Sequence, residues 1–318
     1  MATSGTVTFN LDRDEIIKDA LVDIGAIASE DTPPAAIVNH ASRKLNMLLK
    51  AWQADGLQLW LNKEVVLFLD GTKQYYKLGP SGDHAVLRTD YNKTEVKVAA
   101  VATDTSIDVD TTSGMSVSDY IGIVLDDGTI HWSTVSSITD SDTVVIADAL
   151  ATGATAAVDN NVYWYTTKIN RPLRITDAVV RNDSEEDLWV TVFSRNEYFE
   201  MSGKSTTGQI TNVYYDPQRT SGNLYTYPTT DSVTDRLVLR CQMPIEDMTT
   251  ATDNIDCPQE WLLAIQLKLA VLLSPSYGNL GTSEFQHLKG LAKEEKDTAM
   301  GFDVEGTSLK LQPNKKEM

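Results

Sequence analysis

The sequence predicts an α+β fold: a helical bundle formed by the N- and C-terminal helices, with a β-rich middle and an inserted small all-β domain. Both ends of the chain carry apolar residues at three- and four-residue steps, the spacing of amphipathic helices. The middle has short runs of β-branched and aromatic residues separated by Gly, Asp and Ser, which is typical of strands. Within it, residues 98–167 contain ten carboxylates and neither Lys nor Arg, a change in composition that indicates a separate unit.

The N-terminal helical part of the core is expected at residues 1–63. Asp12 can cap a first helix, and Glu15 completes a capping box with it. A second helix should start near residue 33, at a pair of prolines, and stop at Gly56. Together the two segments predict an antiparallel helical hairpin.

The C-terminal helical part of the core is expected at residues 256–300. Pro258 suits the first position of a helix that should end before Pro275. Ser283 and Gln286 have the spacing of a capping box for a last helix. Because each amphipathic helix must bury its apolar face, we expect the helices from both ends of the chain to pack in one bundle.

Three β segments and one arm complete the expected organisation. Residues 64–97 are predicted to form a β hairpin region, with Asp70-Gly71 as its turn signal. Residues 98–167 would form the inserted acidic all-β domain, in which "LDDGTIHW" is the clearest hairpin, and residues 168–255 a further β-rich region. Residues 301–318 space their few apolar residues too widely to build a core, so we expect an extended C-terminal arm.

The composition bounds the class of protein. With 318 residues, of which 42% are apolar and 23% charged, the chain is long enough to bury sizeable cores. It has no run of about 18 apolar residues and no secretory signal at its N-terminus, so we expect synthesis in the cytosol and no membrane contact. The net charge of −18 argues against general affinity for DNA, whose phosphates such a surface repels.

No string in the sequence demands an enzyme, a cofactor or a metal. The string "SGKSTT" ends like a phosphate-binding loop, but Tyr198 stands where that loop needs its first Gly. The four histidines are far apart, and the two cysteines lack the paired spacing of a zinc site. The carboxylate pairs Glu185-Glu186 and Glu294-Glu295 lie in highly polar runs, where carboxylates stay solvated. We therefore expect no catalytic, cofactor-binding or metal-ligating residues.

Four segments resemble, in their order and style, the head-to-tail adaptor proteins of short-tailed bacteriophages, also described as tail accessory factors or packaged-DNA stabilisation proteins. The segments are "LNMLLKAWQADGLQLW", "RNEYFEMSGKSTTGQITNVYYDPQ", "GNLYTYP" and "CPQEWLLAIQLKLAVLLSPSYG". They cover the helical ends and the β segment from about 168 to 250, and they exclude residues 98–167. None of them is a catalytic motif, so their joint order carries the resemblance.

The resemblance implies a structural virion protein of the head-tail junction, assembled in the host cytoplasm. Twelve copies would form a ring under the portal protein, extend the DNA channel, retain the packaged DNA and receive the tail nozzle protein, with tail fibres as further candidate partners. Genomic DNA would pass without sequence-specific contact, because a channel wall of this charge repels it.

The resemblance also assigns two sets of residues. The first is a core hinge, where the chain leaves the helices for the β region: Trp52, Gly56, Trp60 and Trp261. The second is a portal-binding arm: Phe302, Val304, Leu309, Lys310, Leu311, Lys315 and Lys316. The apolar members of the arm would fill grooves on the portal protein, and its lysines would meet acidic portal surface.

The sequence leaves two other functions open. The paired carboxylates are compatible with a tail-associated peptidoglycan-degrading enzyme, which needs one acid and one base. The small β domain is compatible with a receptor-binding or decoration protein. Lysis of cell walls by the purified chain would favour the enzyme, and a position at the tail tip would favour receptor binding.

Overall fold

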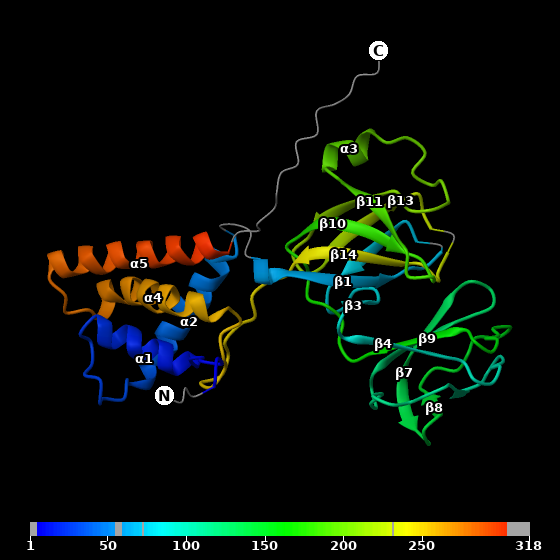
Figure 1. Ribbon diagram of the computed structural model, residues 1–318, viewed down its shortest axis with the longest axis horizontal. Coiled ribbons are helices and arrows are strands. Elements are labelled where there is room, and N and C mark those ends of the chain that lie inside the picture. Colours follow the sequence, from blue (N-terminus) through cyan, green and yellow to red (C-terminus); the bar gives the residue numbers. More distant parts are fainter. Residues whose placement is uncertain (1–4, 55–58, 72, 231, 304–318) are drawn as a thin grey trace, which may run out of the picture. The chain divides into compact units, whose positions relative to one another are not determined.

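The computed structural model describes residues 5–54, 59–71, 73–230 and 232–303 (Figure 1). The chain divides into two compact units. The helical unit contains residues 1–61 and 245–318, and the β unit contains residues 62–244. The helical unit is therefore built from two segments of the chain, and the β unit lies between them in the sequence.

The helical unit contains, in its described part, α1 (Arg13–Asp23), α2 (Ala35–Trp52), η1 (Leu59–Leu61), η2 (Gln259–Trp261), α4 (Leu262–Tyr277) and α5 (Thr282–Phe302). The predicted capping box of α1 is confirmed. The Asp12 carboxylate accepts a hydrogen bond from the Glu15 N–H at 2.8 Å, and the Glu15 carboxylate accepts one from the Asp12 N–H at 3.0 Å. Helix α2 starts after Pro34, near the expected position, whereas its expected stop at Gly56 lies outside the described residues.

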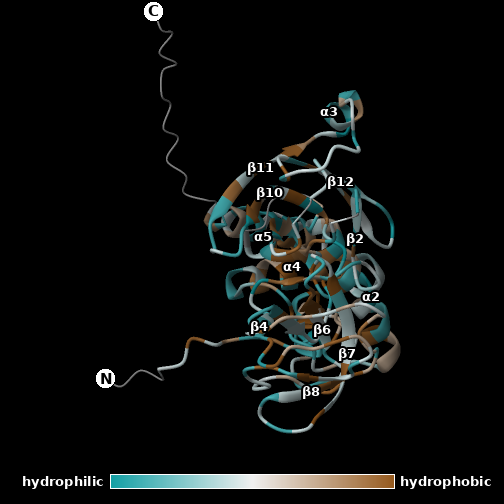
Figure 2. Cartoon of the chain, turned by 90° about the vertical axis from the view of Figure 1, so that its right-hand side faces the viewer, coloured by the Kyte–Doolittle hydropathy of each residue, from teal (hydrophilic) through white to brown (hydrophobic). Residues whose placement is uncertain are grey.

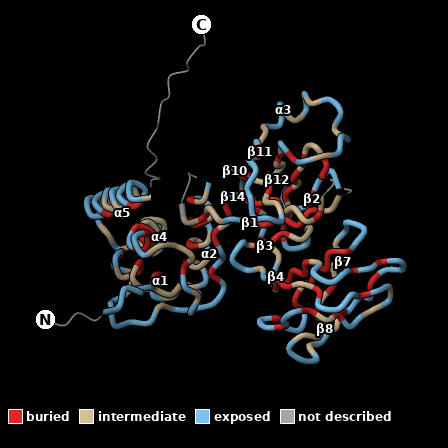
Figure 3. Tube along the Cα trace, turned by 45° about the vertical axis from the view of Figure 1, so that its right-hand side comes forward, coloured by how far each residue is buried: buried red, intermediate tan, exposed pale blue. Residues whose placement is uncertain are grey.

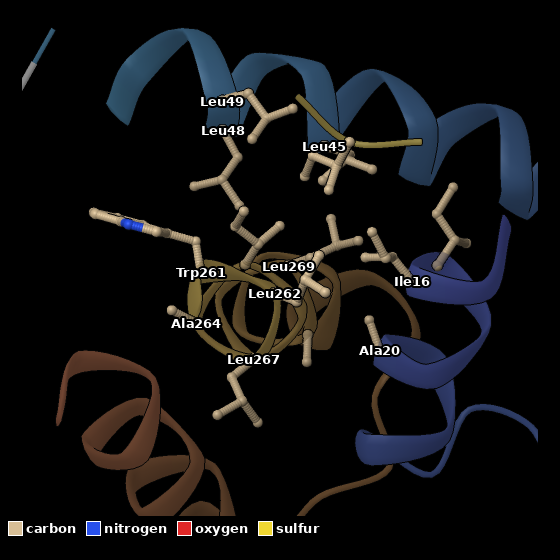
Figure 4. Packing of buried hydrophobic residues seen from close by; sticks show 14 of the residues in the cluster. Ile16, Ala20, Leu45, Leu48, Leu49, Trp261, Leu262, Ala264, Leu267 and Leu269 are labelled. Carbon is tan, nitrogen blue, oxygen red and sulfur yellow. The ribbon is translucent and has the colours of Figure 1, made fainter. Parts of the chain in front are cut away.

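Helix α4 is the central element of the helical unit. Its side chains meet those of α1 and α2 in one hydrophobic cluster, in which Ile16, Leu45 and Leu269 are fully buried (Figure 4). Most residues of α4 are apolar and appear brown in Figure 2, which is typical of a helix that is covered on several sides.

Both C-terminal helices differ from the sequence prediction at one end. Helix α4 does not stop before Pro275 but continues to Tyr277, because a proline in the last turn removes only one helical hydrogen bond. Helix α5 begins slightly before the predicted capping box. There the Glu284 carboxylate accepts the N–H of Gly281 at 2.9 Å, which is the role expected of Gln286.

The β unit contains fourteen strands and one short helix in its described part: β1 (Asn62–Phe68), β2 (Tyr75–Leu78), β3 (Ala85–Leu87), β4 (Tyr91–Glu95), β5 (Ser106–Asp108), β6 (Tyr120–Val124), β7 (Ile130–Ile138), β8 (Thr143–Ile146), β9 (Asn161–Tyr165), β10 (Arg174–Arg181), β11 (Asp187–Phe193), α3 (Arg195–Glu200), β12 (Asn212–Pro217), β13 (Gly222–Tyr227) and β14 (Arg236–Gln242). An eight-stranded sheet has the order β2-β13-β12-β11-β10-β14-β1-β3, and a six-stranded sheet has the order β4-β9-β6-β7-β8-β5. Buried residues, red in Figure 3, lie along the strands of both sheets.

The eight-stranded sheet is strongly curved. All eight strands contribute to one hydrophobic cluster, including Leu67 of β1, Leu78 of β2 and Leu224 of β13. Strands from opposite edges can share one cluster only if the sheet curls around it, so the sheet approaches a barrel. Strands β1 and β2 do not pair with each other, which differs from the hairpin expected at residues 64–97. Instead β1 lies between β14 and β3, and β2 pairs with β13.

The six-stranded sheet contains the "LDDGTIHW" hairpin, as predicted. Strands β6 and β7 are antiparallel with Val124 opposite Ile130, and the Leu125 N–H donates to the carbonyl of Thr129 at 2.8 Å across the turn. Gly128 has a positive φ of 77° in this turn, a conformation that favours glycine. The sheet has a hydrophobic cluster of its own, and its first strand, β4, lies upstream of the predicted domain boundary.

The predicted fold class, a helical bundle with β insertions, is wrong. The structure is mostly β-sheet, and only 26% of it is helical. The strands of the β unit pack on one another in hydrophobic clusters that the helical unit does not complete, so they are not attachments to a helical core. Amphipathic periodicity is more regular in long helices than in short strands, and for that reason the ends of the chain dominate the sequence pattern.

Candidate functional site

Three of the four residues expected at the core hinge come together in the helical unit. The ring of Trp261 has its centroid 5.6 Å from that of Trp52 and 5.0 Å from that of Trp60. Trp52 and Trp261 are buried, and Trp60 is partly buried. The fourth residue, Gly56, lies outside the described residues. We name Trp52, Trp60 and Trp261 the tryptophan cluster.

Each member of the tryptophan cluster belongs to the end of a helix or to a short helical turn. Trp52 is the last residue of α2, Trp60 lies in η1 and Trp261 ends η2. The Nζ atom of Lys296 on α5 lies 5.0 Å from the centroid of the Trp52 ring, within reach of a cation–π interaction. The cluster therefore connects several helical elements close to Leu61, the residue after which the chain leaves the helical unit.

Only one residue of the expected portal-binding arm is described. Phe302 is the last residue of α5, and its side chain is 76% exposed. The remaining members lie outside the described residues: Val304, Leu309, Lys310, Leu311, Lys315 and Lys316. A phenylalanine this exposed leaves most of its apolar surface in water, so its burial against a partner would be favourable.

The helical unit exposes further large apolar side chains: Val7, Phe9, Met47, Leu263 and Met300. Val7 and Phe9 belong to the segment that precedes α1. The carbonyl of Val7 accepts a hydrogen bond from the Gln259 side chain at 2.8 Å, which holds this segment to the start of η2. Scattered exposed apolar residues are normal on soluble proteins, so they indicate contact surface only together with other evidence.

The carboxylates of the acidic segment support turns of the six-stranded sheet. Asp126 accepts hydrogen bonds at 2.9 Å from the Ala157 N–H and from the Asn160 side chain. Hydrogen bonds from Thr155, Ala157 and Asn160 lower the pKa of Asp126 below its ordinary value. Asp126 therefore stays ionised at neutral pH and contributes to the negative charge of this segment.

The β unit holds a second aromatic cluster, which the sequence does not reveal. His84 stacks on Trp132, with ring centroids 3.7 Å apart and ring planes 6° apart. Gly122 lies opposite Trp132 on the neighbouring strand, and a Cβ atom there would be 2.6 Å from the indole ring. Only glycine lets the indole approach the strand this closely. We name Gly122, Trp132 and His84 the histidine stack.

The imidazole of the histidine stack is neutral. Burial lowers the pKa of His84 to about 3, and the nearby Lys168 adds to this lowering. Its Nδ1 atom lies 2.6 Å from the hydroxyl of Tyr165, whose pKa burial raises above its usual range. The phenol therefore keeps its proton, and its hydroxyl shares one hydrogen bond with Nδ1, in the direction that the imidazole tautomer sets. Because His84 directly precedes β3 and Trp132 lies on β7, the stack joins the two sheets of the β unit.

The first carboxylate pair considered for an enzyme takes part in local contacts. Glu185 forms ion pairs with Arg236 and Arg181. The Glu186 carboxylate accepts a hydrogen bond from the Asn182 side chain at 3.1 Å. These contacts hold the connection between β10 and β11.

The other strings that suggest chemistry are placed as follows. The string "SGKSTT" forms a turn before β12, in which the N–H of Thr206 donates to the carbonyl of Gly203 at 3.0 Å. Glu294 and Glu295 are neighbours on α5, and neither is buried.

Across the described ranges, no group of three or more His, Cys, Asp or Glu residues is arranged to hold a metal ion. Among the helices that the structure describes, none combines the length and apolar character needed to cross a membrane. The chain matches no known protein family, and no curated protein matches it significantly. The resemblance to the head-to-tail adaptors therefore rests on the four sequence segments alone.

Proposed function

We propose that the chain is a structural virion protein that connects the head of a short-tailed bacteriophage to its tail. In this proposal a ring of copies lies below the portal protein, extends the DNA channel, retains the packaged DNA and provides the docking site for the tail nozzle protein. The tryptophan cluster is the observation that carries the proposal. The first adaptor-like segment supplies Trp52 and Trp60, the last supplies Trp261, and the two segments meet in one helical unit.

The other two adaptor-like segments support the proposal from the β unit. They form β12 and β13, which pair along their whole length. The ring of Tyr198, which precedes β12, lies 5.1 Å from each of the rings of Tyr214 and Tyr225. Each pair of resembling segments is thus one packed element of structure, as expected if the segments are the shared framework of a family.

The charge of the chain supports a role beside moving DNA. Its net charge of −18 repels phosphates, and a ring repeats this charge around the channel. A wall that does not bind DNA lets the genome pass in both directions without sticking.

Co-sedimentation with purified portal rings of the same virus tests the proposal. The full chain should sediment with the rings, and a chain that lacks residues 303–318 should not. Phe302→Ser should weaken binding about tenfold, because burying a phenylalanine contributes roughly 1.5–3 kcal/mol. Phe199→Ser is the matched control, since Phe199 is 67% exposed but lies in the β unit.

Two results would contradict this proposal. A full chain that does not sediment with the rings would refute portal binding. Equal weakening by Phe302→Ser and Phe199→Ser would show that the end of α5 is not the point of contact.

A further inference from the structure

A cavity of about 280 Å³ lies beside the histidine stack. Residues from two turns of the β unit line this cavity. The turn after β1 contributes Asp70 and Lys73, and the hairpin between β6 and β7 contributes Thr129 and Ile130. His84 lies between the two walls, so the cavity belongs to the place where the two sheets of the β unit meet.

The charged residues in the described lining of the cavity are two carboxylates, Asp70 and Asp83, and one ammonium, Lys73, which both carboxylates hold. The Nζ atom of Lys73 lies 2.7 Å from the carboxylate of Asp83 and 3.6 Å from that of Asp70. Burial alone would lower the pKa of Lys73, but the hydrogen bond to Asp83 and the two negative charges raise it, so the ammonium stays charged. The two carboxylates outnumber the one ammonium among the described lining residues, so an anionic ligand would lose its hydration here and gain no cation that the protein has not already paired.

His84 adds a polar ring nitrogen, Nε2, to the cavity. Because Nδ1 is hydrogen-bonded to the Tyr165 hydroxyl, Nε2 is the ring nitrogen that can meet a ligand, as a donor in one tautomer and as an acceptor in the other. Among the described residues Nε2 has no hydrogen-bond partner, and His84 is part of the cavity lining. A ligand hydroxyl, which both donates and accepts, would satisfy it in either tautomer.

We propose that this cavity binds one uncharged polyol ring, such as a neutral hexoside. A hydroxyl group both donates and accepts hydrogen bonds. It is therefore the group that satisfies Nε2 of His84, the ammonium of Lys73 and the nearby carboxylates within one small space. The apolar edges of Phe68 and Trp132 match the C–H surface of a sugar ring, and the volume suits about a dozen non-hydrogen atoms.

The lining argues against a phosphate-bearing ligand. A nucleotide or sugar phosphate needs a surplus of positive charge or a run of backbone N–H groups. Here the one lining ammonium, Lys73, is held by Asp70 and Asp83. The chemistry of the cavity fits a sugar that is either free or the end of a polysaccharide.

Saturation-transfer NMR on the full chain tests this proposal. The probes are the methyl α-glycosides of glucose, galactose and mannose, with glucosamine and glucuronate as charged comparators. At least one neutral glycoside should bind with a dissociation constant on the order of 1 mM, as expected for a ligand this small. Dextran is then added to the bound glycoside. If dextran displaces the glycoside, the cavity accepts the end of a polysaccharide chain; if it does not, the cavity accepts only a free sugar. Either result upholds the site.

Two variants should weaken binding of the neutral glycoside at least tenfold. Lys73→Met removes a donor, and Thr129→Tyr fills the cavity from an exposed turn without touching a buried core. Lys77→Met is the matched control, because Lys77 lines the neighbouring hollow but not this cavity. Circular dichroism and thermal melting establish that each variant is folded before binding is compared.

Three outcomes would overturn the proposal. The first is that no neutral glycoside shows saturation transfer. The second is that the neutral glycoside binds equally well to wild type, Lys73→Met and Thr129→Tyr. The third is that only a charged comparator binds. None of these outcomes depends on portal binding, so the cavity and the connector role are tested separately.

Discussion

The tryptophan cluster and the histidine stack are both aromatic, but they differ in chemistry. The tryptophan cluster joins indole rings, which hold no proton that titrates near neutral pH. The histidine stack joins an indole to an imidazole that is neutral only because it is buried between the sheets. The indoles of the tryptophan cluster meet at steep angles, whereas His84 and Trp132 lie parallel. The comparison teaches that aromatic packing can be insensitive to pH in one unit and sensitive to acid in the other. Three substitutions and one pH titration test this contrast.

Removing the central indole of the tryptophan cluster should have the largest effect. Trp261→Ala leaves a cavity next to two other indoles and should destabilise the helical unit by about 4 kcal/mol. Urea unfolding measures this loss. Trp189→Ala is the control, because Trp189 on β11 is 69% exposed and its removal should cost less than about 0.5 kcal/mol. Similar losses for the two variants would mean that Trp261 is not central to the packing.

Substituting Gly122 of the histidine stack should have the second-largest effect on the free energy of unfolding. In Gly122→Ala the new methyl group would lie 2.6 Å from the ring of Trp132, so the indole must move away from the strand and from His84. Overpacking of this kind costs about 2–3 kcal/mol. Gly290→Ala on α5 is the control and should stabilise the protein. A Cβ atom at this position would meet no side chain or distant backbone atom within 4 Å, and alanine favours a helix. If Gly122→Ala left the free energy of unfolding unchanged, this would contradict the close approach of Gly122 and Trp132.

Acid should weaken the β unit through His84. Its folded-state pKa, about 3, lies below its ordinary value of 6.5, so the unfolded chain binds a proton that the folded chain does not. Lys168 and Lys73 oppose protonation and Asp83 favours it. Stability should therefore fall as pH drops from 6.5 toward 3, by about 2 kcal/mol between pH 7 and pH 5.

The titration has a matched control. His84→Phe keeps an aromatic ring on Trp132 but cannot gain a proton, and Tyr165→Phe in the same chain removes the hydroxyl that would otherwise lose its hydrogen-bond partner. The double variant should show a flatter dependence of unfolding free energy on pH over this range. An unchanged slope would place the acid sensitivity elsewhere in the chain.

The smallest effect should come from the cation at the edge of the tryptophan cluster. Lys296→Met keeps the aliphatic stem over the Trp52 ring but removes the charge 5.0 Å from its centroid. The expected loss is about 0.5 kcal/mol, as for a cation–π contact at a partly exposed site. A loss above about 2 kcal/mol, measured by urea unfolding, would mean that the cluster depends on charge as much as on packing.

The sequence predicts local structure well in this chain and long-range pairing poorly. The Asp12 capping box and the "LDDGTIHW" hairpin depend on residues a few positions apart, and both are present. The partners of β1 and β2 are β14 and β13, far along the chain, and no local signal selects them. For the same reason the balance between helical and β architecture was predicted wrongly.

The candidate sites show the same limit. Trp52, Trp60 and Trp261 are identified by a resemblance that spans the chain, and the fold brings them into contact. His84 and Trp132 are unrelated in spacing, and only the meeting of two sheets pairs them. A histidine beside a turn and a tryptophan in a strand give no signal on their own, so sequence reasoning misses both the stack and the cavity next to it.

Electron microscopy of intact tailed particles, labelled with a gold-tagged antibody against this chain, tests the central claim most directly. The connector account predicts label at the head-tail junction, where a ring of copies would lie between the portal and the tail nozzle. Label at the tail tip or over the head surface would contradict it and would favour a receptor-binding or decoration protein.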